Sequence, residues 1–351
     1  MILRKVSCTL IAFALLILAG SGIFAAQPEF HQPTAGGQER ALPDVMQEDA
    51  ALEARLEAIA TGHKGELTVF ASNLKTGRTA ALHADTPVQT ASVIKLAILL
   101  HAAEEIRAGR ANLEEKLVLT PDNRAPGSGV LYDLDTPLTL TLRDVLTLMV
   151  VVSDNTATNM AIDRFGLEKI DATIVAAGLK QTWLYKKVFR PATGPMPADQ
   201  PKFGLGKTTA REMAAIMERL VECRLDLTDG PVRPGDGPIC GAMLGMLRQQ
   251  QDRDGLPRYL ETLDTSEAGS AIGNKTGALD AVRNDVAVIA TKAGPIVIAA
   301  FTQQNQDQRW TGDNQAEKTL GRVGAAVVQA WSPSGLDPTA IDWRNPLAAS
   351  K

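Results

Sequence analysis

Ser92 and Lys95 have the residue types and the spacing to do chemistry together. Three positions apart in a predicted helix, their side chains lie on one face, within hydrogen-bond reach. Ser92 lies at the helix N-terminus, where unpaired backbone N–H groups and the helix dipole favour a developing negative charge. The apolar residues around Lys95 predict a buried amine with a lowered pKa, which can accept the proton of a serine hydroxyl. The pair therefore predicts a serine nucleophile activated by a lysine.

An S-x-x-K pair alone does not establish this chemistry. A chain of this size contains about one such match by chance, and a capping serine followed by a surface lysine gives the same pattern. Ser72 and Lys75 form a second match, and Lys75-Thr76-Gly77 also spells K-T-G. Both lie in a predicted hairpin turn, where a glycine after polar residues is ordinary turn chemistry. The assignment of Ser92 therefore depends on further motifs.

Two further motifs follow Ser92-x-x-Lys95 along the chain. Ser153-Asp154-Asn155 lies in a predicted break between helices, and Lys275-Thr276-Gly277 lies at the edge of a predicted C-terminal strand. The S-D-N triplet occurs by chance in ~5% of chains this long. In this order the three motifs resemble those of the penicillin-recognising serine enzymes, and of class A β-lactamases in particular. Residues 153–159 and 284–288 extend the resemblance, which covers about residues 49–331.

The resemblance implies a role for each residue of the predicted catalytic set. Ser92 is the nucleophile that forms an acyl-enzyme, and Lys95 activates it, directly or through a neighbour. Ser153 relays a proton to the departing nitrogen. Lys275 assists Ser153, and its positive charge favours a substrate carboxylate. Asp154 is interpreted as structural.

The resemblance also implies contacts with the substrate. Asn155 would hydrogen-bond the side-chain amide of the substrate, and Thr276 would contact its carboxylate. After Gly277 comes Ala278, whose backbone N–H would form an oxyanion hole together with that of Ser92. Such a pair of pre-aimed donors stabilises a tetrahedral intermediate.

One family residue is missing from this sequence. Class A β-lactamases carry a glutamate in the loop after the S-D-N helices, and it activates the water that hydrolyses the acyl-enzyme. Here residues 184–207 contain no glutamate, and their only acid is Asp199, which is more similar to a structural aspartate of that loop. Hydrolysis needs a general base within reach of the water. If neither Lys95 nor Asp199 serves, a β-lactam would acylate Ser92 and stay.

Three functions therefore remain open. The first is a β-lactamase or a close β-lactamase-type hydrolase. The second is a D,D-peptidase, or a related amidase or esterase, acting on cell-wall-like substrates. The third is a module that binds or senses a β-lactam or peptide without turnover. The expected partner is in each case a small-molecule β-lactam or a peptidoglycan-like substrate.

The elements that must position these motifs predict an α+β fold. Period-two patterns predict strands over residues 67–71, 79–83, 271–277, 284–290 and 296–302. Helices are predicted over 46–60, 92–108, 142–152 and 315–331, with one more ending at 165–166, one beginning after Thr208 or Thr209, and a long loop over 178–207. Strands at both ends of the chain predict one antiparallel sheet, flanked by N- and C-terminal helices, with an inserted all-helical lobe. The sheet lobe would comprise about 45–90 and 271–332, and the helical lobe about 91–270.

The N-terminus predicts export. Arg4 and Lys5 precede an apolar run that ends in small residues near Ala26, which is typical of a secretory signal peptide over 1–26. An uncleaved anchor is the alternative, because the run approaches spanning length. A flexible segment (27–44), a hydrolase domain (45–332) and a C-terminal tail (333–351) would follow. The mature protein is expected to be periplasmic or secreted, a monomer, and without stable membrane insertion.

Composition excludes some classes of protein. The net charge of −4, the absence of a basic stripe and an aromatic content of 4% argue against a nucleic-acid partner. After signal cleavage Cys223 and Cys240 remain, either as a disulfide or as two buried thiols. Four histidines without clustered Cys/His spacing argue against a zinc site, and the sequence indicates no metal or organic cofactor.

Overall fold

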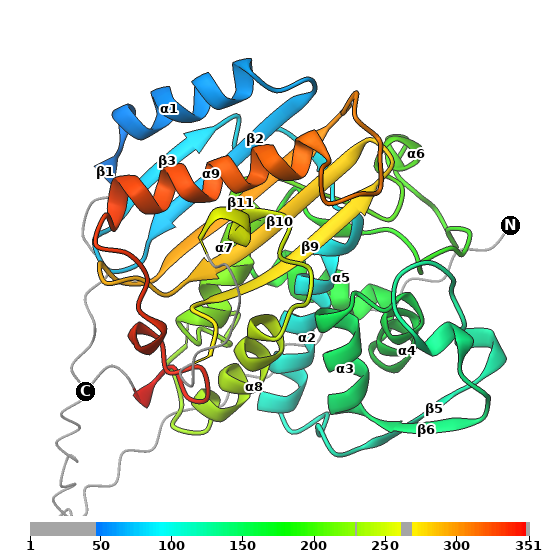
Figure 1. The fold of residues 1–351 in the computed structure, drawn as a ribbon. Coiled ribbons are helices and arrows are strands. Elements are labelled where there is room, and N and C mark those ends of the chain that lie inside the picture. The colour runs from blue at the N-terminus through cyan, green and yellow to red at the C-terminus, as the bar shows by residue number, and fades with distance from the viewer. Residues whose placement is uncertain (1–46, 229, 261–268, 349–351) are drawn as a thin grey trace, which may run out of the picture. The chain divides into compact units, whose positions relative to one another are not determined.

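Six strands form the central sheet of the protein, in the order β1-β3-β2-β11-β10-β9 (Figure 1). The computed structural model describes residues 47–228, 230–260 and 269–348, so the predicted signal peptide and the segment 27–44 lie outside the described residues. The strands are β1 (Gln47–Glu48), β2 (Glu66–Asn73), β3 (Arg78–Leu82), β9 (Ile272–Leu279), β10 (Val282–Ile289) and β11 (Ile296–Gln303). Neighbours pair antiparallel, except β1 with β3. The predicted antiparallel sheet, built from both ends of the chain, is confirmed.

The sheet is buried on both faces. In β10, Val286 and Val288 belong to the larger hydrophobic core, whereas Ala287 and Ile289 belong to a second core. Because successive side chains of a strand point to opposite faces, one strand serves both cores. Helix α7 (Ala210–Val221) contacts the sheet at β2, β10 and β11 and contributes to the larger core. On the second face, α1 (Ala50–Thr61) and α9 (Gln315–Trp331) lie side by side (Figure 1).

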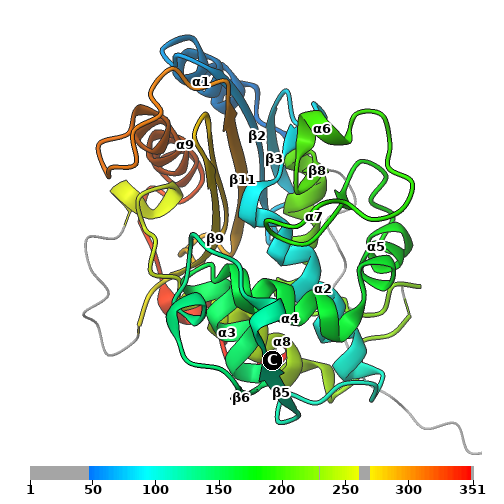
Figure 2. The same cartoon turned by 90° about the vertical axis from the view of Figure 1, so that its right-hand side faces the viewer.

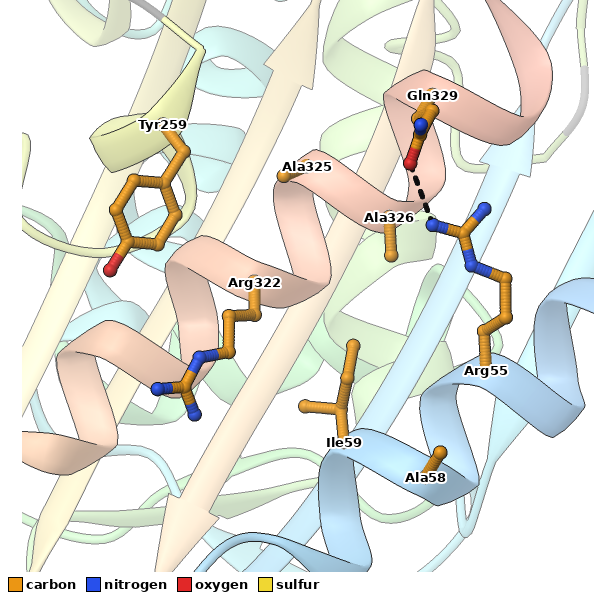
Figure 3. A pocket seen from close by; sticks show the side chains of 8 residues that line it. All are labelled: Arg55, Ala58, Ile59, Tyr259, Arg322, Ala325, Ala326 and Gln329. Carbon is orange, nitrogen blue, oxygen red and sulfur yellow. Dashed lines mark hydrogen bonds between the residues drawn. The ribbon is translucent and has the colours of Figure 1, made fainter.

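A shallow pocket of about 380 Å³ lies between α1 and α9 (Figure 3). Arg55 Nη2 of α1 donates to Gln329 Oε1 of α9 at 2.8 Å beside this pocket. Its lining residue Ala326 belongs to the second core, whereas Val93 and Ile94, which follow Ser92, belong to the larger one. The pocket and the predicted nucleophile therefore lie on opposite faces of the sheet.

The remaining helices gather around α2 (Lys95–Arg107) (Figure 2). Its contacts include α3 (Leu142–Val151), α4 (Asn155–Phe165), α5 (Leu167–Ala176), α7 and α8 (Asp236–Arg248). Residues 96–100 of α2 are 0% exposed, as expected of a helix that is apolar on all sides. The sequence prediction of a helix in the middle of the protein is confirmed, and only Glu104, Ile106 and Arg107 near its end are partly exposed.

Local structure differs from the sequence prediction in several places. The predicted helix 46–60 begins only at Ala50, because Gln47–Glu48 form β1. A 3-10 turn, Ala91–Ile94, precedes α2, so the α-helix begins at Lys95 and not at Ser92. Helices α5 and α8 and the hairpin of β5 (Lys116–Leu119) and β6 (Leu138–Thr141) are not among the predicted elements. The predicted loop 178–207 contains β7 (Trp183–Leu184), α6 (Gln200–Phe203) and β8 (Gly206–Thr208), and β8 joins β7 to β4 (Val88–Gln89) in a small sheet. Segments of two to four residues are too short to show a period.

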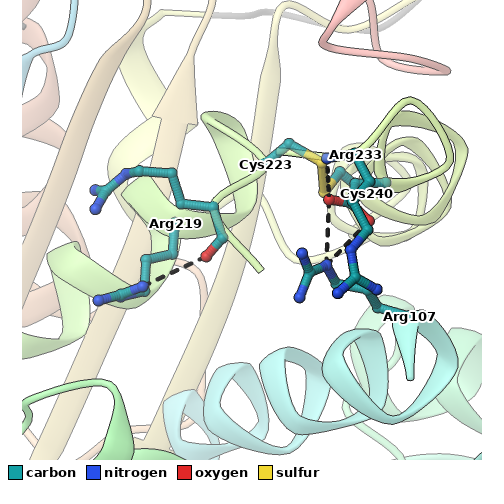
Figure 4. The surroundings of a disulfide bond; sticks show 7 residues. Arg107, Arg219, Cys223, Arg233 and Cys240 are labelled. Carbon is teal, nitrogen blue, oxygen red and sulfur yellow. Dashed lines mark hydrogen bonds and ion pairs between the residues drawn. A yellow bond between two sulfur atoms is a disulfide. The ribbon is translucent and has the colours of Figure 1, made fainter. Parts of the chain in front are cut away.

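A disulfide joins Cys223, just after α7, to Cys240 in α8 (Figure 4). The disulfide, and not two separate thiols, is therefore the state of this pair. Arg107, at the end of α2, connects that helix to the segment between α7 and α8 and to the start of α8. Its guanidinium pairs with Asp226 at 3.0 Å and with Asp236 at 3.1 Å.

Residues 333–348, which follow α9, pack onto the rest of the protein. Ile341 and Trp343 are buried in the larger core, and Leu336 forms a β-bridge with Thr291. The part of the predicted C-terminal tail that is described therefore contributes to the core. Within the described ranges, the chain has no helix with both the length and the apolar character needed to cross a bilayer.

Candidate active site

Ser92 lies half-buried in the 3-10 turn between the sheet and α2. Ala91 before it has a φ of +42°, which costs about 1–3 kcal/mol in a residue other than glycine and persists only where surrounding contacts determine the backbone. Those contacts come from Asn284 of β10, whose Nδ2 donates to the carbonyls of Gln89 at 2.9 Å and Thr90 at 3.2 Å. The sheet therefore fixes the turn that presents Ser92.

Strand β9 passes directly beside this turn at Gly277. A Cβ atom at Gly277 would lie 2.9 Å from the backbone nitrogens of Ser92 and Val93, closer than van der Waals contact allows, so the position requires glycine. Gly277 lies opposite Asn284 in the strand register, so β9 and β10 act on the turn at the same point. The predicted oxyanion donors, the N–H groups of Ser92 and Ala278, come from these two touching backbone segments.

Lys95 is fully buried at the start of α2. Its backbone N–H donates to the Ser92 carbonyl, and its Nζ donates to Ser153 O at 2.7 Å, to Ser153 Oγ at 3.1 Å and to Asn155 Oδ1 at 3.1 Å. Burial, reinforced by the positive charge of Lys275, lowers the pKa of Lys95 well below its ordinary value, against the opposing attraction of Asp154. The neutral amine, which can accept a proton, is thereby favoured.

Ser153 bridges two buried lysines. It has a φ of +55° and lies in the break between α3 and α4. Its Oγ is 3.1 Å from the Nζ of Lys95 and 3.1 Å from the Nζ of Lys275. Burial lowers the pKa of Lys275 to about 8, although Asp252 and Asp285 act to raise it. Lys275 therefore keeps its proton at neutral pH.

The partners of Lys95 determine where its lone pair points. A neutral amine keeps two N–H donors, one fewer than the ammonium. The Ser153 carbonyl and Asn155 Oδ1 can only accept, and the amide of Asn155 is oriented by its Nδ2, which donates to Pro126 O at 2.8 Å. The lone pair then faces Ser153 Oγ, whose hydroxyl can donate to it. With Lys275 on the other side of that oxygen, the arrangement can pass a proton between Ser153 and Lys95.

Asp154 anchors the loop on the other side of the S-D-N motif. Its Oδ1 accepts from Ala157 N at 2.8 Å and caps α4. Its Oδ2 accepts from the backbone N–H groups of Val130 at 2.7 Å and Leu131 at 2.9 Å. Because the Asp154 carboxylate accepts each of these hydrogen bonds from a backbone N–H group, its contacts support the interpretation of Asp154 as structural.

Asn159 holds the loop that lacks the family glutamate. Its Oδ1 accepts from Val188 N at 2.9 Å, and its Nδ2 donates to Val188 O at 3.1 Å. Phe189, with a φ of +52°, is 64% exposed. Lys187 just before them pairs with Asp163 of α4, so the part of the loop fixed against α4 carries a cation and two apolar residues, and no acid. Asp199, the only acid of this loop, instead pairs with Lys207 at 2.9 Å.

The structure brings most of the predicted site residues together. One hydrogen-bonded cluster contains Lys95, Ser153, Asn155 and Lys275. Gly277 touches the Ser92 turn. Thr276 is half-buried, and because side chains alternate along a strand it lies on the side of β9 opposite to Lys275.

The second S-x-x-K match lies elsewhere. Ser72 is buried in β2 and its hydroxyl donates to Glu218 of α7. Lys75 belongs to the turn between β2 and β3, where Gly77 has a φ of +72°. The prediction that this match is ordinary turn chemistry is confirmed for Lys75 to Gly77, whereas Ser72 lies in the strand before the turn.

Sequence reasoning missed the positioning roles of Asn284 and Asn159. Each is a buried polar residue, at 2% and 1% exposure, and each satisfies backbone groups of another segment. A buried asparagine must find such partners. That expectation, applied to the two motif segments in which they occur, could have identified them.

Comparisons with known proteins agree with this geometry. A sequence profile described as the beta-lactamase enzyme family matches residues 51–331. The chain is similar to the solved beta-lactamase from Sphaerobacter thermophilus DSM 20745, with 31% identity and a TM-score of 0.67 over 80% of this chain and 97% of that one. No curated protein sequence matches significantly.

Two more distant structures share the fold. PBP-A is 23% identical with a TM-score of 0.67, over 83% of this chain and 98% of its own. An ancestral class A beta-lactamase is 20% identical with a TM-score of 0.65, over 80% and 99%. The family match spans all three motifs and most of the chain. On this evidence the chain belongs to the beta-lactamase enzyme family.

Proposed function

We propose that this protein is a serine hydrolase that opens a β-lactam ring, or a related amide, through an acyl-enzyme on Ser92. The observation that carries the proposal is the buried hydrogen-bonded chain Lys95–Ser153–Lys275 next to the Ser92 turn. A serine is activated by a neighbouring amine of lowered pKa. Membership of the family supplies the coarser statement, a hydrolase of the β-lactamase type.

The proposed acylation moves one proton around a short cycle. Ser92 Oγ attacks the lactam carbonyl carbon, and its proton passes through the Ser153 hydroxyl to neutral Lys95, whose lone pair faces Ser153 Oγ. The carbonyl oxygen takes up the electron pair and is held by the N–H groups of Ser92 and Ala278. Ser153 then gives its proton to the lactam nitrogen as the C–N bond breaks, and Lys95 returns the proton to Ser153. The enzyme is left as a Ser92 ester.

The substrate contacts are proposed from charge and hydrogen bonding. Lys275, protonated below pH about 8, would attract the substrate carboxylate. Asn155 would meet the side-chain amide of the substrate. Because Asn155 Nδ2 donates to Pro126 O, a substrate carbonyl would share or replace that partner.

A second candidate is a D,D-peptidase, or a related amidase or esterase, whose β-lactam ester is hydrolysed slowly. The observation that favours it is the loop held by Asn159, which presents Val188 and Phe189 in place of an acid, while Asp199 is tied to Lys207. Hydrolysis requires a base within reach of water. A variant of PBP-A, which shares this fold, was captured as an acyl-enzyme with penicillin G. At the limit of no deacylation, this candidate becomes a β-lactam-binding module.

A chromogenic cephalosporin and a fluorescent penicillin separate these candidates. Steady colour supports the β-lactamase, whereas a one-to-one burst with persistent label supports the peptidase or the binding module. Asp199→Asn tests the loop acid, because unchanged turnover would remove Asp199 from deacylation.

Ser92→Ala is expected to abolish both turnover and covalent label, since the ester can no longer form. Ser72→Ala, at the second S-x-x-K match, is the control and should retain both signals. Covalent label that survives in the Ser92 variant would overturn the assignment of the nucleophile.

We further propose that the protein acts in the periplasm or outside the cell as a monomer. The basic and apolar N-terminus supports export. The Cys223–Cys240 disulfide also supports it, because such bonds persist mainly in oxidising compartments.

A further inference from the structure

His101, Glu104 and Glu105 form a cluster on α2 that the proposed reaction does not use. One ring nitrogen of His101 and one carboxylate oxygen of each glutamate all lie within 4.8 Å of one another. Residues three and four positions apart on a helix share a face, so a single helix can bring these groups together. His101 follows Lys95 by six residues, roughly 9 Å along the helix axis. The cluster is therefore separate from the Ser92 site.

The ring of His101 has the surroundings of a metal ligand. Nδ1 lies 2.7 Å from Thr173 Oγ1 of α5, whereas Nε2 is buried with no hydrogen-bond partner on a residue that is 2% exposed. Metal-bound histidines characteristically donate their other ring N–H to an oxygen, and Nδ1 is placed to do so.

The two glutamates already attract a cation. Arg110 Nη2 lies 2.8 Å from Glu104 Oε2, and its Nε lies 2.9 Å from Glu105 Oε1. The Arg110 side chain is 55% exposed, whereas the side chains of Glu104 and Glu105 are 21% and 11% exposed. A divalent cation can therefore approach from the side of Arg110 and compete with its guanidinium for the two carboxylates.

The surroundings leave room for an ion. The cluster lines a pocket of about 220 Å³, together with Arg110 and Lys169. This volume exceeds the roughly 30 Å³ that one water molecule occupies in the liquid. An ion that still carries water ligands therefore fits.

We propose that His101, Glu104 and Glu105 bind one divalent transition-metal ion of the Zn²⁺ type, through His101 Nε2 and one oxygen of each carboxylate, in place of Arg110. One imidazole, two carboxylates and a water form a four-coordinate Zn²⁺ site. Mg²⁺ and Ca²⁺, which take oxygen ligands, fit this donor set less well. The search for Cys/His spacing in the sequence overlooked this site, because two of its ligands are glutamates.

The bound ion is expected to strengthen the connection between helices α2 and α5. The ion would fix the His101 ring, and Thr173 would connect that ring to α5. A ligand that binds only the folded chain raises its melting temperature by mass action. Zn²⁺ is therefore expected to raise the melting temperature, whatever the activity at Ser92.

Calorimetric titration of the purified chain with ZnCl₂ tests the proposal. One ion per chain is expected. Glu104→Gln, on the more exposed side of the cluster, should weaken binding about 10- to 100-fold, on the scale of changes around metal sites, and should lose the Zn²⁺-dependent rise in melting temperature. Arg110→Ala should tighten binding, because the competing cation is gone. Co²⁺ substitution should give a visible d–d spectrum of low coordination number that Glu104→Gln removes.

His83→Gln is the matched control, since His83 is exposed and outside the cluster. It should leave Zn²⁺ binding unchanged. Cysteine does not compete among the described residues, because Cys223 and Cys240 form the disulfide. Unchanged binding in both Glu104→Gln and Arg110→Ala, in chains whose circular dichroism matches the native one, would overturn the proposal.

Discussion

Two buried lysines with different surroundings share one serine hydroxyl. Lys95 has the positive charge of Lys275 close by, which adds to the effect of burial and lowers its pKa well below the ordinary value. Lys275 is buried to the same extent, but Asp252 and Asp285 oppose the effect and leave its pKa at about 8. One residue type can therefore supply a proton acceptor and a fixed cation within a single cluster.

The pKa of Lys275 predicts a pH limit on substrate capture. As the pH rises through about 8, Lys275 loses its proton and its attraction for a substrate carboxylate. We expect the second-order rate constant of penicillin labelling to fall above pH 8 by about 10-fold per pH unit, the slope of one titrating group. Rates measured from pH 6 to pH 10 check this.

Lys275→Arg is the control for this pH limit. An arginine stays protonated throughout the range, so the variant should show a flat alkaline limb, even if its absolute rate is lower. A wild-type rate that stays constant up to pH 10 would contradict the assigned role of Lys275.

At the scale of elements, the site depends on a close approach of β9 to the 3-10 turn before α2. Gly277 permits this approach, and Asn284 on the neighbouring strand holds the carbonyls just before Ser92. The nucleophile, the third motif and the two strands therefore act as one positioning unit. Helix α4 acts similarly on the loop through Asn159.

Gly277→Ala is expected to slow acylation by about 100-fold, since a displacement near 1 Å at a reacting centre has that effect. The new methyl would overlap the backbone nitrogens of Ser92 and Val93, which cannot move aside as a side chain would. Penicillin labelling kinetics measure the loss. Gly245→Ala, where a Cβ meets open space, should label at the native rate, and equal rates for the two variants would count against the positioning unit.

Helix α5 holds the loop 178–207 through Asp171. Asp171 Oδ1 accepts from Leu184 N at 2.9 Å, and burial raises the pKa of this carboxyl to about 6. Because the folded-state pKa lies above the unfolded value near 4, the protonated carboxyl contributes stability that is full below about pH 4 and lost as the pH rises through about 6.

Asp171→Asn should therefore stabilise the protein above pH 6. The amide cannot ionise and its oxygen can still accept from Leu184. The gain at pH 8 is expected to be about 1–3 kcal/mol, from the pKa difference and 1.36 kcal/mol per unit, and it should vanish near pH 4. Urea unfolding at both pH values measures it. The same gain at pH 4 and pH 8 would refute the titration of Asp171 as its cause.

At the scale of the whole molecule, one sheet contributes to two hydrophobic cores. In the larger core, a disulfide joins Cys223, just after α7, to Cys240 in α8. The bond spans 17 positions of the chain, for which the chain-entropy estimate is about 3 kcal/mol. The Cys223→Ser, Cys240→Ser double variant is expected to melt about 6–12 °C lower, at the usual shift of 2–4 °C per kcal/mol for larger domains.

Scanning calorimetry of this double variant and of the chemically reduced protein checks the expectation. Penicillin labelling of Ser92 in the variant at low temperature provides the control for folding. A melting temperature equal to that of the oxidised protein would show that the disulfide adds nothing to stability.

The sequence predicted the core strands and the C-terminal helix well, whereas it missed helices α5 and α8 and the short strands. Strands 284–290 and 296–302 and the helix 315–331 agree with β10, β11 and α9 to within a residue or two, because burial imposes a period on runs of that length. The small sheet of β4, β8 and β7 falls below that length. Its partners come from distant parts of the chain, so local patterns carry no signal for it.

Residue types and periods along the chain were by themselves sufficient for the three motifs, the α+β class and a buried amine at Lys95. Only the tertiary structure decided that Ser153 Oγ lies 3.1 Å from the Nζ atoms of both Lys95 and Lys275, that Asn284 holds the turn before Ser92, and that Asn159 binds the loop backbone at Val188. The physical reason is the range of the forces involved. Periodicity reports whether a side chain is buried, whereas hydrogen bonds and pKa shifts depend on which atoms from distant segments come within about 3 Å.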